Sequence, residues 1–327
     1  MTHILELIHA FRRSKILFTA VSLGIFDRLQ GAPATAVQLA SDLNLHPGAL
    51  TRLLDACIPL GLLTCEEGRY RNTSDASRAL VTASADSLVG YILHSDRSLY
   101  PLWGRLDHAV REGTNRWAQV FGDRASLFDH YFRDPASMRS FLTGMHGAGQ
   151  LTSDRIVRAF DLTKFEHLVD LGGATGHLAI AACRAYPRLR ATVLDLPAVE
   201  PYAREFIAKN GLADRIAFKS ADFFQDDLPP ADLYSLGRIL HDWDDTRIQT
   251  LLSKIHGDLL VTEVLMDEDR RGPLYAMLQD LNMLVCTDGK ERTASEYEHL
   301  LQLAGFRRFE FHRTNSLLDG ILAYRQP

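Results

Sequence analysis

Short apolar runs alternate with amphipathic helical segments between residues 167 and 264, and this alternation most constrains the fold. The runs predict strands at 167–171, 191–194, 216–219, 233–236 and 259–264, with helices at 176–186, 199–209 and 244–255. Such alternation predicts a doubly wound, mainly parallel α/β sheet. Helices at 273–286 and 294–304 then precede strands at 306–313 and 319–324, and the short turn between these last strands predicts an antiparallel edge.

A glycine-rich turn, VDLGGATG, joins the first of these strands to the first helix. Gly172, Gly173 and Gly176 allow the backbone to approach a ligand closely, and the helix N-terminus offers unpaired N–H groups. The turn has neither the G-x-G-x-x-G nor the G-K-[ST] pattern, so a nicotinamide dinucleotide or a nucleoside triphosphate is disfavoured. Taken alone, the turn is also compatible with a plain strand-to-helix connection.

Carboxylates follow the next two strands. Asp195 ends the second strand, where a carboxylate can bind both hydroxyls of a ribose. Asp222 and Phe223 follow the third strand and offer a carboxylate beside an aromatic face that suits an adenine ring. Because the carboxyl ends of parallel strands meet at one edge, the three strand ends predict a nucleoside pocket, with three unrelated polar caps as the alternative.

The fourth strand runs into RILHDWDD at 238–245, which places His241 at the same edge of the sheet. Its neighbours Asp242, Asp244 and Asp245 favour a protonated imidazole, which suits a general base or an ion pair. A histidine at a strand end is otherwise a capping or hydrogen-bonding residue, so this position alone assigns no role.

Composition excludes several classes of protein. A chain of 327 residues with 46% hydrophobic content can bury a full core, and a net charge of −5 provides no basic field for nucleic acid or a membrane. No apolar stretch approaches the ~18 residues of a membrane span, and the N-terminus predicts an amphipathic helix and not a signal peptide. The cysteines lack C-x-x-C spacing, so we expect reduced thiols, no metal and a cytoplasmic protein; they are Cys57, Cys65, Cys183 and Cys286.

The first 98 residues predict a separate domain. Helical segments at 3–12, 14–29, 35–43 and 47–60 precede a hairpin at 62–72 with its turn at 66–68, which is a winged-helix arrangement. From Gln30 to Asp75 there are three basic and five acidic residues, and the candidate recognition helix carries only Arg52. This balance disfavours DNA binding and favours a packing or dimerisation module. Residues 99–165 look helical, with breaks at Gly113, Gly122, Pro135 and Gly144.

The motifs VDLGGATG, VLDLP, ADFF and RILHDWDD, in that order, resemble those of class I S-adenosylmethionine-dependent O-methyltransferases of the caffeate and acetylserotonin type. VTEVLMDED at 261–269 and DGKERTASEYEHLLQLAGF at 288–306 agree with that family. The resemblance spans nearly the whole chain, because the family also begins with a winged-helix dimerisation domain. KILFTA, LNMLV and GKER are most similar to the acetylserotonin methyltransferase-like branch. A Rossmann-like methyltransferase domain at 99–327 and a dimerisation domain at 1–98 are therefore expected.

The resemblance implies a homodimer that transfers a methyl group from S-adenosylmethionine to a hydroxyl of a small aromatic acceptor, a phenol or a hydroxyindole. By position, Gly172 and its loop would hold the methionine end, Asp195 the ribose, and Asp222 with Phe223 the adenine. Arg238 matches a basic residue near the cofactor. Departures from the family are Ala174-Thr175, where a third glycine is common, and Ala221, where a glycine is frequent before Asp222. The segment at 253–261 is also short, which we expect to trim a loop beside the sheet without touching the pocket.

The same resemblance implies that His241 is the general base and that Glu263 and Glu291 flank and orient it. Glu263 ends the strand expected beside the His241 strand, and a carboxylate against an imidazole fixes its tautomer. For each glutamate alone, a surface ion pair is the alternative. We expect Asp242 to matter less, because adjacent residues on an extended chain point to opposite faces.

Apolar side chains are candidates for the acceptor pocket, with ordinary core packing as the alternative for each. They are Phe141, Met145, Trp243, Met283 and, more remotely, Tyr100. Two other functions stay open: a noncatalytic or repurposed S-adenosylmethionine-binding homologue, and a ligand-responsive transcription factor. The combination of His241 with both glutamates opposes the first, and the acidic winged-helix segment opposes the second.

Overall fold

The computed structural model describes residues 2–122 and 135–326 and divides into two compact units. The first comprises residues 1–100 together with 143–147, and the second comprises residues 101–142 and 148–327. Among the described residues, no helix is both long enough and apolar enough to cross a membrane.

The first unit consists of helices and a small antiparallel sheet with strand order β1-β3-β2. Its elements are α1 (His3–Ser22), α2 (Ile25–Gly31), β1 (Ala34–Thr35), α3 (Ala36–Asp42), α4 (Pro47–Cys57), β2 (Leu63–Glu66), β3 (Arg69–Asn72), α5 (Ser74–Ala79), α6 (Val89–His94) and a π-helical turn (Ser95–Leu99). Glu67 and Gly68 both have positive φ, as a two-residue hairpin turn requires. The expected helix pair and hairpin wing are therefore present, and the short strand β1 adds to the wing.

The predicted break near residue 13 is wrong, because α1 is one helix that ends at Ser22. The run Arg12-Arg13-Ser14-Lys15 interrupts the apolar pattern, but its side chains are exposed, and Arg and Lys favour helix. The break comes instead at Gly24, which has φ +73.

The predicted break at Gly144 is also wrong, because Gly144 lies inside the long helix α11 (Pro135–Ala159). A Cβ there would lie 2.6 Å from backbone atoms of Gly90 and Tyr91, so this glycine permits close packing. Gly113 and Gly122 do end helices, and Pro135 begins α11. The shorter helices before α11 are α7 (Tyr100–Trp103), α8 (Leu106–Glu112) and α9 (Trp117–Phe121).

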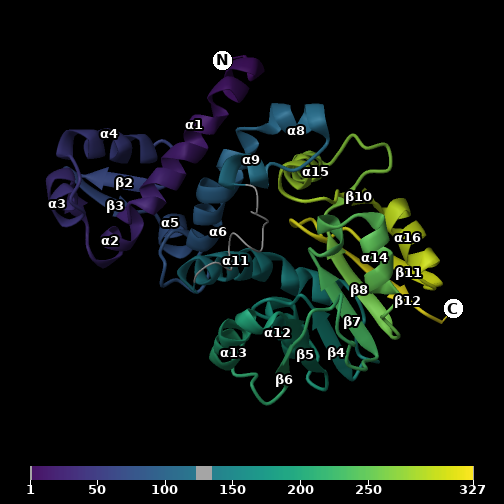
Figure 1. Cartoon of the computed structure of the whole chain (residues 1–327). Coiled ribbons are helices and arrows are strands. Elements are labelled where there is room, and N and C mark those ends of the chain that lie inside the picture. The colour runs from purple at the N-terminus through teal and green to yellow at the C-terminus, as the bar shows by residue number, and fades with distance from the viewer. Residues whose placement is uncertain (1, 123–134, 327) are drawn as a thin grey trace. The chain divides into compact units, whose positions relative to one another are not determined.

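A seven-stranded sheet with order β11-β12-β8-β7-β4-β5-β6 forms the centre of the second unit (Figure 1). The strands are β4 (His167–Leu171), β5 (Arg190–Asp195), β6 (Ile216–Ser220), β7 (Leu233–Gly237), β8 (Asp258–Glu263), β11 (Arg308–His312) and β12 (Asp319–Tyr324). Strands β4 to β8 are parallel, and β12 and β11 continue the sheet antiparallel. The doubly wound sheet with an antiparallel edge is thus confirmed.

Helices cover both faces of this sheet, with α12 and α13 on one side and α14 and α16 on the other (Figure 1). Their bounds are α12 (His177–Ala185), α13 (Glu200–Lys209), α14 (Asp245–Leu252) and α16 (Ala294–Leu303), and the unit also contains α15 (Leu274–Cys286) and the short strands β9 (Leu265–Met266) and β10 (Arg292–Thr293). Successive residues of β4 enter different cores: Leu168 packs with α12 and Val169 with α14. Strands buried on both faces explain the continuous apolar runs of the sequence.

The short connection between α14 and β8 lies at the edge of the sheet where β8 begins. A Cβ at Gly257 would lie 2.6 Å from the carbonyl oxygen of Ala231, so the tight connection requires glycine. Glu263 stands at the other end of β8. The shortened segment at 253–261 therefore begins away from the candidate site, as expected.

Candidate active site

The glycine-rich turn and Asp195 are joined by hydrogen bonds at the carboxyl edge of the sheet. The Asp195 carboxylate accepts from the Ala174 N–H at 2.8 Å and from the Leu196 N–H at 2.7 Å. Each oxygen keeps acceptor capacity, because a carboxylate oxygen can take more than one hydrogen bond. Burial raises the pKa of Asp195 to about 6 despite these two donors.

Two glycines of the turn are required by backbone conformation, since Gly172 and Gly176 have φ of +65 and +78. Gly173 is required by space, because a Cβ would lie 2.6 Å from the Asp170 carboxylate. Ala174 also has a positive φ, +49, although it carries a side chain. Ala174, which stands where the resemblance leads one to expect a third glycine, therefore occupies a left-handed position.

Phe223 and Arg238 come to the same edge from two further strands. A Cβ at Gly172 would lie 3.3 Å from the Phe223 ring and 2.6 Å from Ile239, so these segments are in close contact. Arg238 has φ +55, and its N–H donates to the Thr262 carbonyl at 3.0 Å. A non-glycine residue held in this region marks a position constrained by its surroundings.

The Asp222 carboxylate accepts from the Phe224 N–H at 2.8 Å and from the Gln225 side-chain amide at 2.9 Å. It therefore caps the turn that carries Phe223. A strand-end aspartate that caps a turn and one that binds a ligand look alike in the sequence. Of the seven predicted cofactor residues, Asp195 ends β5 and the other six belong to the loops that follow β4, β6 and β7.

His241 lies on a 3₁₀ turn, Leu240–Asp242, just after β7. Its Nδ1 is 2.9 Å from Oε1 of Glu291 and 3.5 Å from Oε2 of Glu263. All three side chains are buried. The structure thus brings the three predicted catalytic residues into one cluster, with Glu291 as the hydrogen-bond partner of the imidazole.

Glu263 makes its shortest contacts with the backbone. Its Oε1 accepts from the N–H groups of Ile239 at 3.0 Å and Leu240 at 2.9 Å. The carboxylate therefore holds the turn that carries His241, and its second oxygen faces the ring.

A two-stranded parallel pairing explains how the two glutamates meet. Leu265 of β9 pairs with Arg292 of β10, so the residues just before these strands come side by side. Glu263 ends β8 shortly before β9, and Glu291 directly precedes β10. The Glu291 N–H also donates to the Asp280 carboxylate on α15 at 3.0 Å.

Asp242 lies closer to the imidazole than expected, with Oδ1 3.6 Å from Nε2 of His241. The expectation of opposite faces assumed an extended chain, whereas residues 240–242 form a 3₁₀ turn. Asp242 therefore stands beside the ring nitrogen that Glu291 does not occupy. Burial raises the pKa of Asp242 to about 6.

Opposing effects set the protonation of His241. Burial by itself lowers its pKa, but the negative charges of Glu263, Glu291 and Asp242 outweigh burial and raise the pKa to about 10. Burial also raises the pKa of Glu263, and a positive charge on His241 opposes that rise. Positive charge on the imidazole is thus strongly favoured here.

The ligand atoms of His241, Glu263 and Glu291 lie within 4.8 Å of one another, so this donor set could also hold a divalent metal. Nδ1 of His241 is already engaged with Glu291, and Oε1 of Glu263 with two backbone N–H groups, whereas Oε2 of each glutamate has no hydrogen-bond partner among the described residues. A cation at this point would have to displace the imidazole–carboxylate hydrogen bond.

The five acceptor candidates lie on α7, α11, α15 and the segment between the 3₁₀ turn and α14, with Tyr100 as the first residue of α7. Phe141 and Met145 are four residues apart on α11, which puts them on one face of that helix, and Met145 belongs to the first unit. Met283 is buried on α15, the helix before the loop that carries Glu291. Trp243 instead packs edge-to-face on Phe224, with ring centroids 5.2 Å apart, beneath the guanidinium of Arg247.

Sequence reasoning missed Gly289, which fits against the His241 turn. A Cβ at Gly289 would lie 2.1 Å from the His241 carbonyl oxygen and 2.6 Å from the Trp243 nitrogen. Its φ is not in the left-handed region, so close approach alone requires glycine. The signal available in the sequence was a glycine two residues before a candidate catalytic glutamate.

The strand order, in which five parallel strands continue into an antiparallel pair, defines a Rossmann-like methyltransferase fold. This chain belongs to the O-methyltransferase family: the O-methyltransferase domain matches residues 103–307, and the O-methyltransferase dimerisation domain matches residues 5–83. The resemblance seen in the sequence motifs is therefore confirmed.

Relatives of known name agree with this membership. Acetylserotonin O-methyltransferase of Gallus gallus is 40% identical over 96% of this chain and 94% of its own length. A probable bifunctional dTTP/UTP pyrophosphatase/methyltransferase protein of Homo sapiens is 41% identical over 98% of this chain, which spans about half (53%) of that relative. The crystal structure of human N-acetylserotonin methyltransferase in complex with SAM superposes with a TM-score of 0.93 at 38% identity, covering 99% of this chain and 97% of that one.

Proposed function

We propose that this enzyme transfers a methyl group from S-adenosylmethionine to a hydroxyl of a small aromatic acceptor of the hydroxyindole type, with His241 as general base. The relatives named acetylserotonin O-methyltransferase support the acceptor class, and the human structure with SAM supports the methyl donor. The observation that carries the proposal is the 2.9 Å contact between Nδ1 of His241 and Glu291 at the edge where the cofactor residues gather.

The strand-end residues fit an adenosyl group. Gly172, Gly173 and Gly176 leave the backbone of the first loop open beside the methionine end. Asp195 retains acceptors for the ribose hydroxyls, and Phe223 offers a ring face to the adenine beside Asp222. Arg238 completes this edge. When bound, S-adenosylmethionine supplies a methyl group carried on a positively charged sulfur.

His241 acts on the acceptor hydroxyl through Nε2, since Nδ1 is engaged with Glu291. The acceptor hydroxyl would give up its proton to Nε2 as its oxygen takes the methyl group, with the methyl–sulfur bond broken and the donor leaving as a neutral thioether. Glu291 and Glu263 would stabilise the imidazolium that results. A phenol has a pKa of ~10. With the pKa of His241 raised to about 10, proton transfer between acceptor and base is close to thermoneutral.

Phe141 and Met283, both in the second unit, are proposed to line the acceptor pocket, and Met145 stays a candidate from the sequence. We place Trp243 differently from the sequence expectation: its packing on Phe224 puts it next to the loop of Asp222 and Phe223, so it supports the adenine side. A change of acceptor preference should therefore follow substitution at Met283 more readily than at Trp243.

A homodimer is proposed from the dimerisation domain, with residues 1–98 as the dimerisation module and 99–327 as the catalytic part. We propose the cytoplasm as the compartment, supported by four cysteines that are free thiols. Neither nucleic acid nor a membrane is proposed as a partner, given the acidic balance of the winged-helix segment.

Mass spectrometry on a panel of phenols and hydroxyindoles with S-adenosylmethionine tests the proposal. The wild type should add one methyl group to at least one hydroxyindole, and His241→Ala should lower kcat by about 10²- to 10⁴-fold. His256→Ala is the matched control, because His256 is exposed in the connection at the opposite end of β8. No methylated product from the wild type would refute the activity, and full rate in His241→Ala would refute the base.

A further inference from the structure

We infer that Arg292 is a positioning residue that holds the His241 turn in its catalytic geometry from behind, an inference that rests on the proposed function of His241. Arg292 follows Glu291 directly and is 1% exposed. Burying a guanidinium is costly unless its donors are all satisfied, so its partners indicate what it is for.

The hydrogen-bond partners of Arg292 lie on both sides of His241 in the chain. The two Nη atoms of Arg292 donate to the carbonyl oxygens of Leu240 and Trp243, each at 3.1 Å, on either side of His241 and Asp242. Nη1 also donates to the Lys290 carbonyl at 3.1 Å, and Nη2 donates to the Asp245 carboxylate at 2.7 Å. The planar guanidinium thus connects the segment that carries Glu291 to residues 239–243 around His241, which we call the base turn.

The turn needs such support, because its own closing hydrogen bond is weak. The Trp243 N–H lies 3.4 Å from the Leu240 carbonyl, beyond the usual range. Glu263 holds the N–H groups at the start of the turn, and Arg292 holds the carbonyl groups at its end. Together the two side chains hold the main chain both before and after His241.

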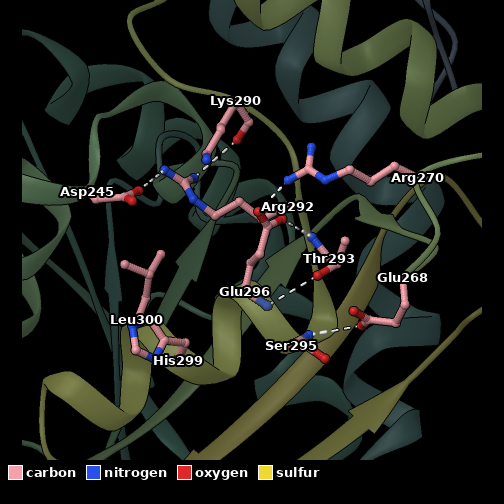
Figure 2. A pocket seen from close by; sticks show the side chains of 10 residues that line it. All are labelled: Asp245, Glu268, Arg270, Lys290, Arg292, Thr293, Ser295, Glu296, His299 and Leu300. Carbon is pink, nitrogen blue, oxygen red and sulfur yellow. Dashed lines mark hydrogen bonds and ion pairs between the residues drawn. The ribbon is translucent and has the colours of Figure 1, made fainter.

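A polar pocket of about 470 Å³ lies behind Arg292 (Figure 2). Its walls are paired with one another: Arg270 binds Glu296, Glu296 closes a capping box with Thr293, and Glu268 accepts from the Ser295 N–H. These contacts fix the N-terminus of α16 directly after Arg292. The pocket is thus walled by groups that hold β10, and the Arg292 guanidinium points toward Asp245 and Lys290 (Figure 2).

Arg292→Lys tests the inference, because lysine keeps the charge but cannot span the two carbonyl groups with a planar fork. We expect kcat to fall at least tenfold, with the KM for the acceptor and the Kd for S-adenosylmethionine within about twofold of wild type. The ring nitrogens of ¹⁵N-labelled His241, followed by NMR through a pH titration, should show a pKa lower than in the wild type, because the contact with Glu291 loosens.

Arg325→Lys is the matched control. Arg325 also donates to backbone carbonyls, including those of Leu252 and Ala304, but contacts none of residues 238–243. It should lower the melting temperature and leave kcat and the His241 titration as in the wild type. If Arg292→Lys changes only the melting temperature, as Arg325→Lys does, Arg292 is merely structural and the inference is overturned.

The NMR titration and a second variant, Asp245→Asn, make the test independent of turnover and of the folding of Arg292→Lys. The NMR titration needs no turnover, so it separates failure of this inference from failure of the proposed methyl transfer. If Arg292→Lys does not fold, Asp245→Asn decides, since it removes the one charged partner of the fork, a residue with a 58% exposed side chain. A lower kcat and a lower His241 pKa in that variant support the inference, and wild-type values for both overturn it.

Discussion

Nδ1 of His241 lies 2.9 Å from Oε1 of Glu291, although fifty residues separate the two in the chain. This contact fixes which ring nitrogen faces the carboxylate, and the proposed base acts through the other nitrogen, Nε2. It also sets the protonation equilibrium on which the proposed base depends.

The rate of the wild-type enzyme should increase toward alkaline pH. A general base must be unprotonated, and the raised pKa of His241 keeps it protonated until well above its ordinary value of 6.5. Glu291→Gln removes one of the anions that favour the imidazolium, so the rising limb of kcat/KM should move to lower pH by about 1–3 units. Steady-state kinetics from pH 6 to 10 measure this shift. Glu66→Gln, an exposed residue of the hairpin, is the control, and a limb that moves upward in Glu291→Gln contradicts the assignment.

Affinity for S-adenosylmethionine should fall as the pH is lowered through 6. The pKa of Asp195 is raised to about 6 by burial, so its carboxylate is ionised above that pH and loses acceptor strength below it. Calorimetric titration at pH 8 should show about 10- to 100-fold weaker binding for Asp195→Asn, as for a charged hydrogen-bond acceptor. Asp214→Asn, at an exposed position, serves as control. Equal affinity of Asp195→Asn and wild type at pH 8 would remove Asp195 from the cofactor site.

Chelation should leave the rate unchanged. The contact between Nδ1 of His241 and Glu291 has hydrogen-bond length, and the methyl donor carries its own positive charge. The measurement is the initial rate before and after dialysis against EDTA, paired with elemental analysis of the protein. Loss of activity that one equivalent of zinc restores would assign the His241, Glu263 and Glu291 cluster to a metal instead.

Gly289→Ala adds only a methyl group but should lower both the stability and the kcat of the enzyme. The added Cβ would lie 2.1 Å from the His241 carbonyl, so either the 287–291 loop or the base turn must move. Overpacking of this kind costs roughly 1–3 kcal/mol in stability, and displacement of the base should lower kcat at least tenfold. Gly31→Ala, where a Cβ meets nothing within 4 Å, is the control for thermal melting and kinetics. Wild-type kcat in Gly289→Ala would show that the turn tolerates the shift.

Ala174→Gly should stabilise the protein slightly. Alanine in the left-handed region costs ~1–2 kcal/mol, and glycine removes this strain from the folded state. Glycine also increases the conformational freedom of the unfolded chain, which cancels part of the gain in stability. We expect the melting temperature to increase by about 1–3 °C, measured by calorimetry. A lower melting temperature would indicate that the Ala174 methyl group packs favourably in the loop.

The motif residues were predictable from the sequence because each follows a strand whose apolar run is long enough to recognise. Their convergence follows from parallel topology, so the order of strands and helices along the chain is enough to assign Asp195 and His241 to one edge. The pairing of β9 with β10 could not be predicted, since two-residue strands have no periodicity. The closeness of Asp242 to the imidazole could not be predicted either, because a 3₁₀ turn of three residues looks extended in a sequence. The role of Arg292 depends on the packed chain, since only there is its charge buried against carbonyl groups.

The hydrogen bonds that hold the base turn end on main-chain atoms: Glu263 takes two N–H groups, and Arg292 reaches two carbonyls. Main-chain partners are the same whatever side chains stand at residues 239, 240 and 243. Substitution of Met283 on α15, a proposed acceptor residue, should therefore leave these main-chain hydrogen bonds in place. If Phe141 and Met283 form the acceptor pocket as proposed, proton chemistry and acceptor choice are separable by mutagenesis, so a library at these two positions that keeps Asp280, the acceptor of the Glu291 N–H, can test new acceptors with the catalytic turn intact.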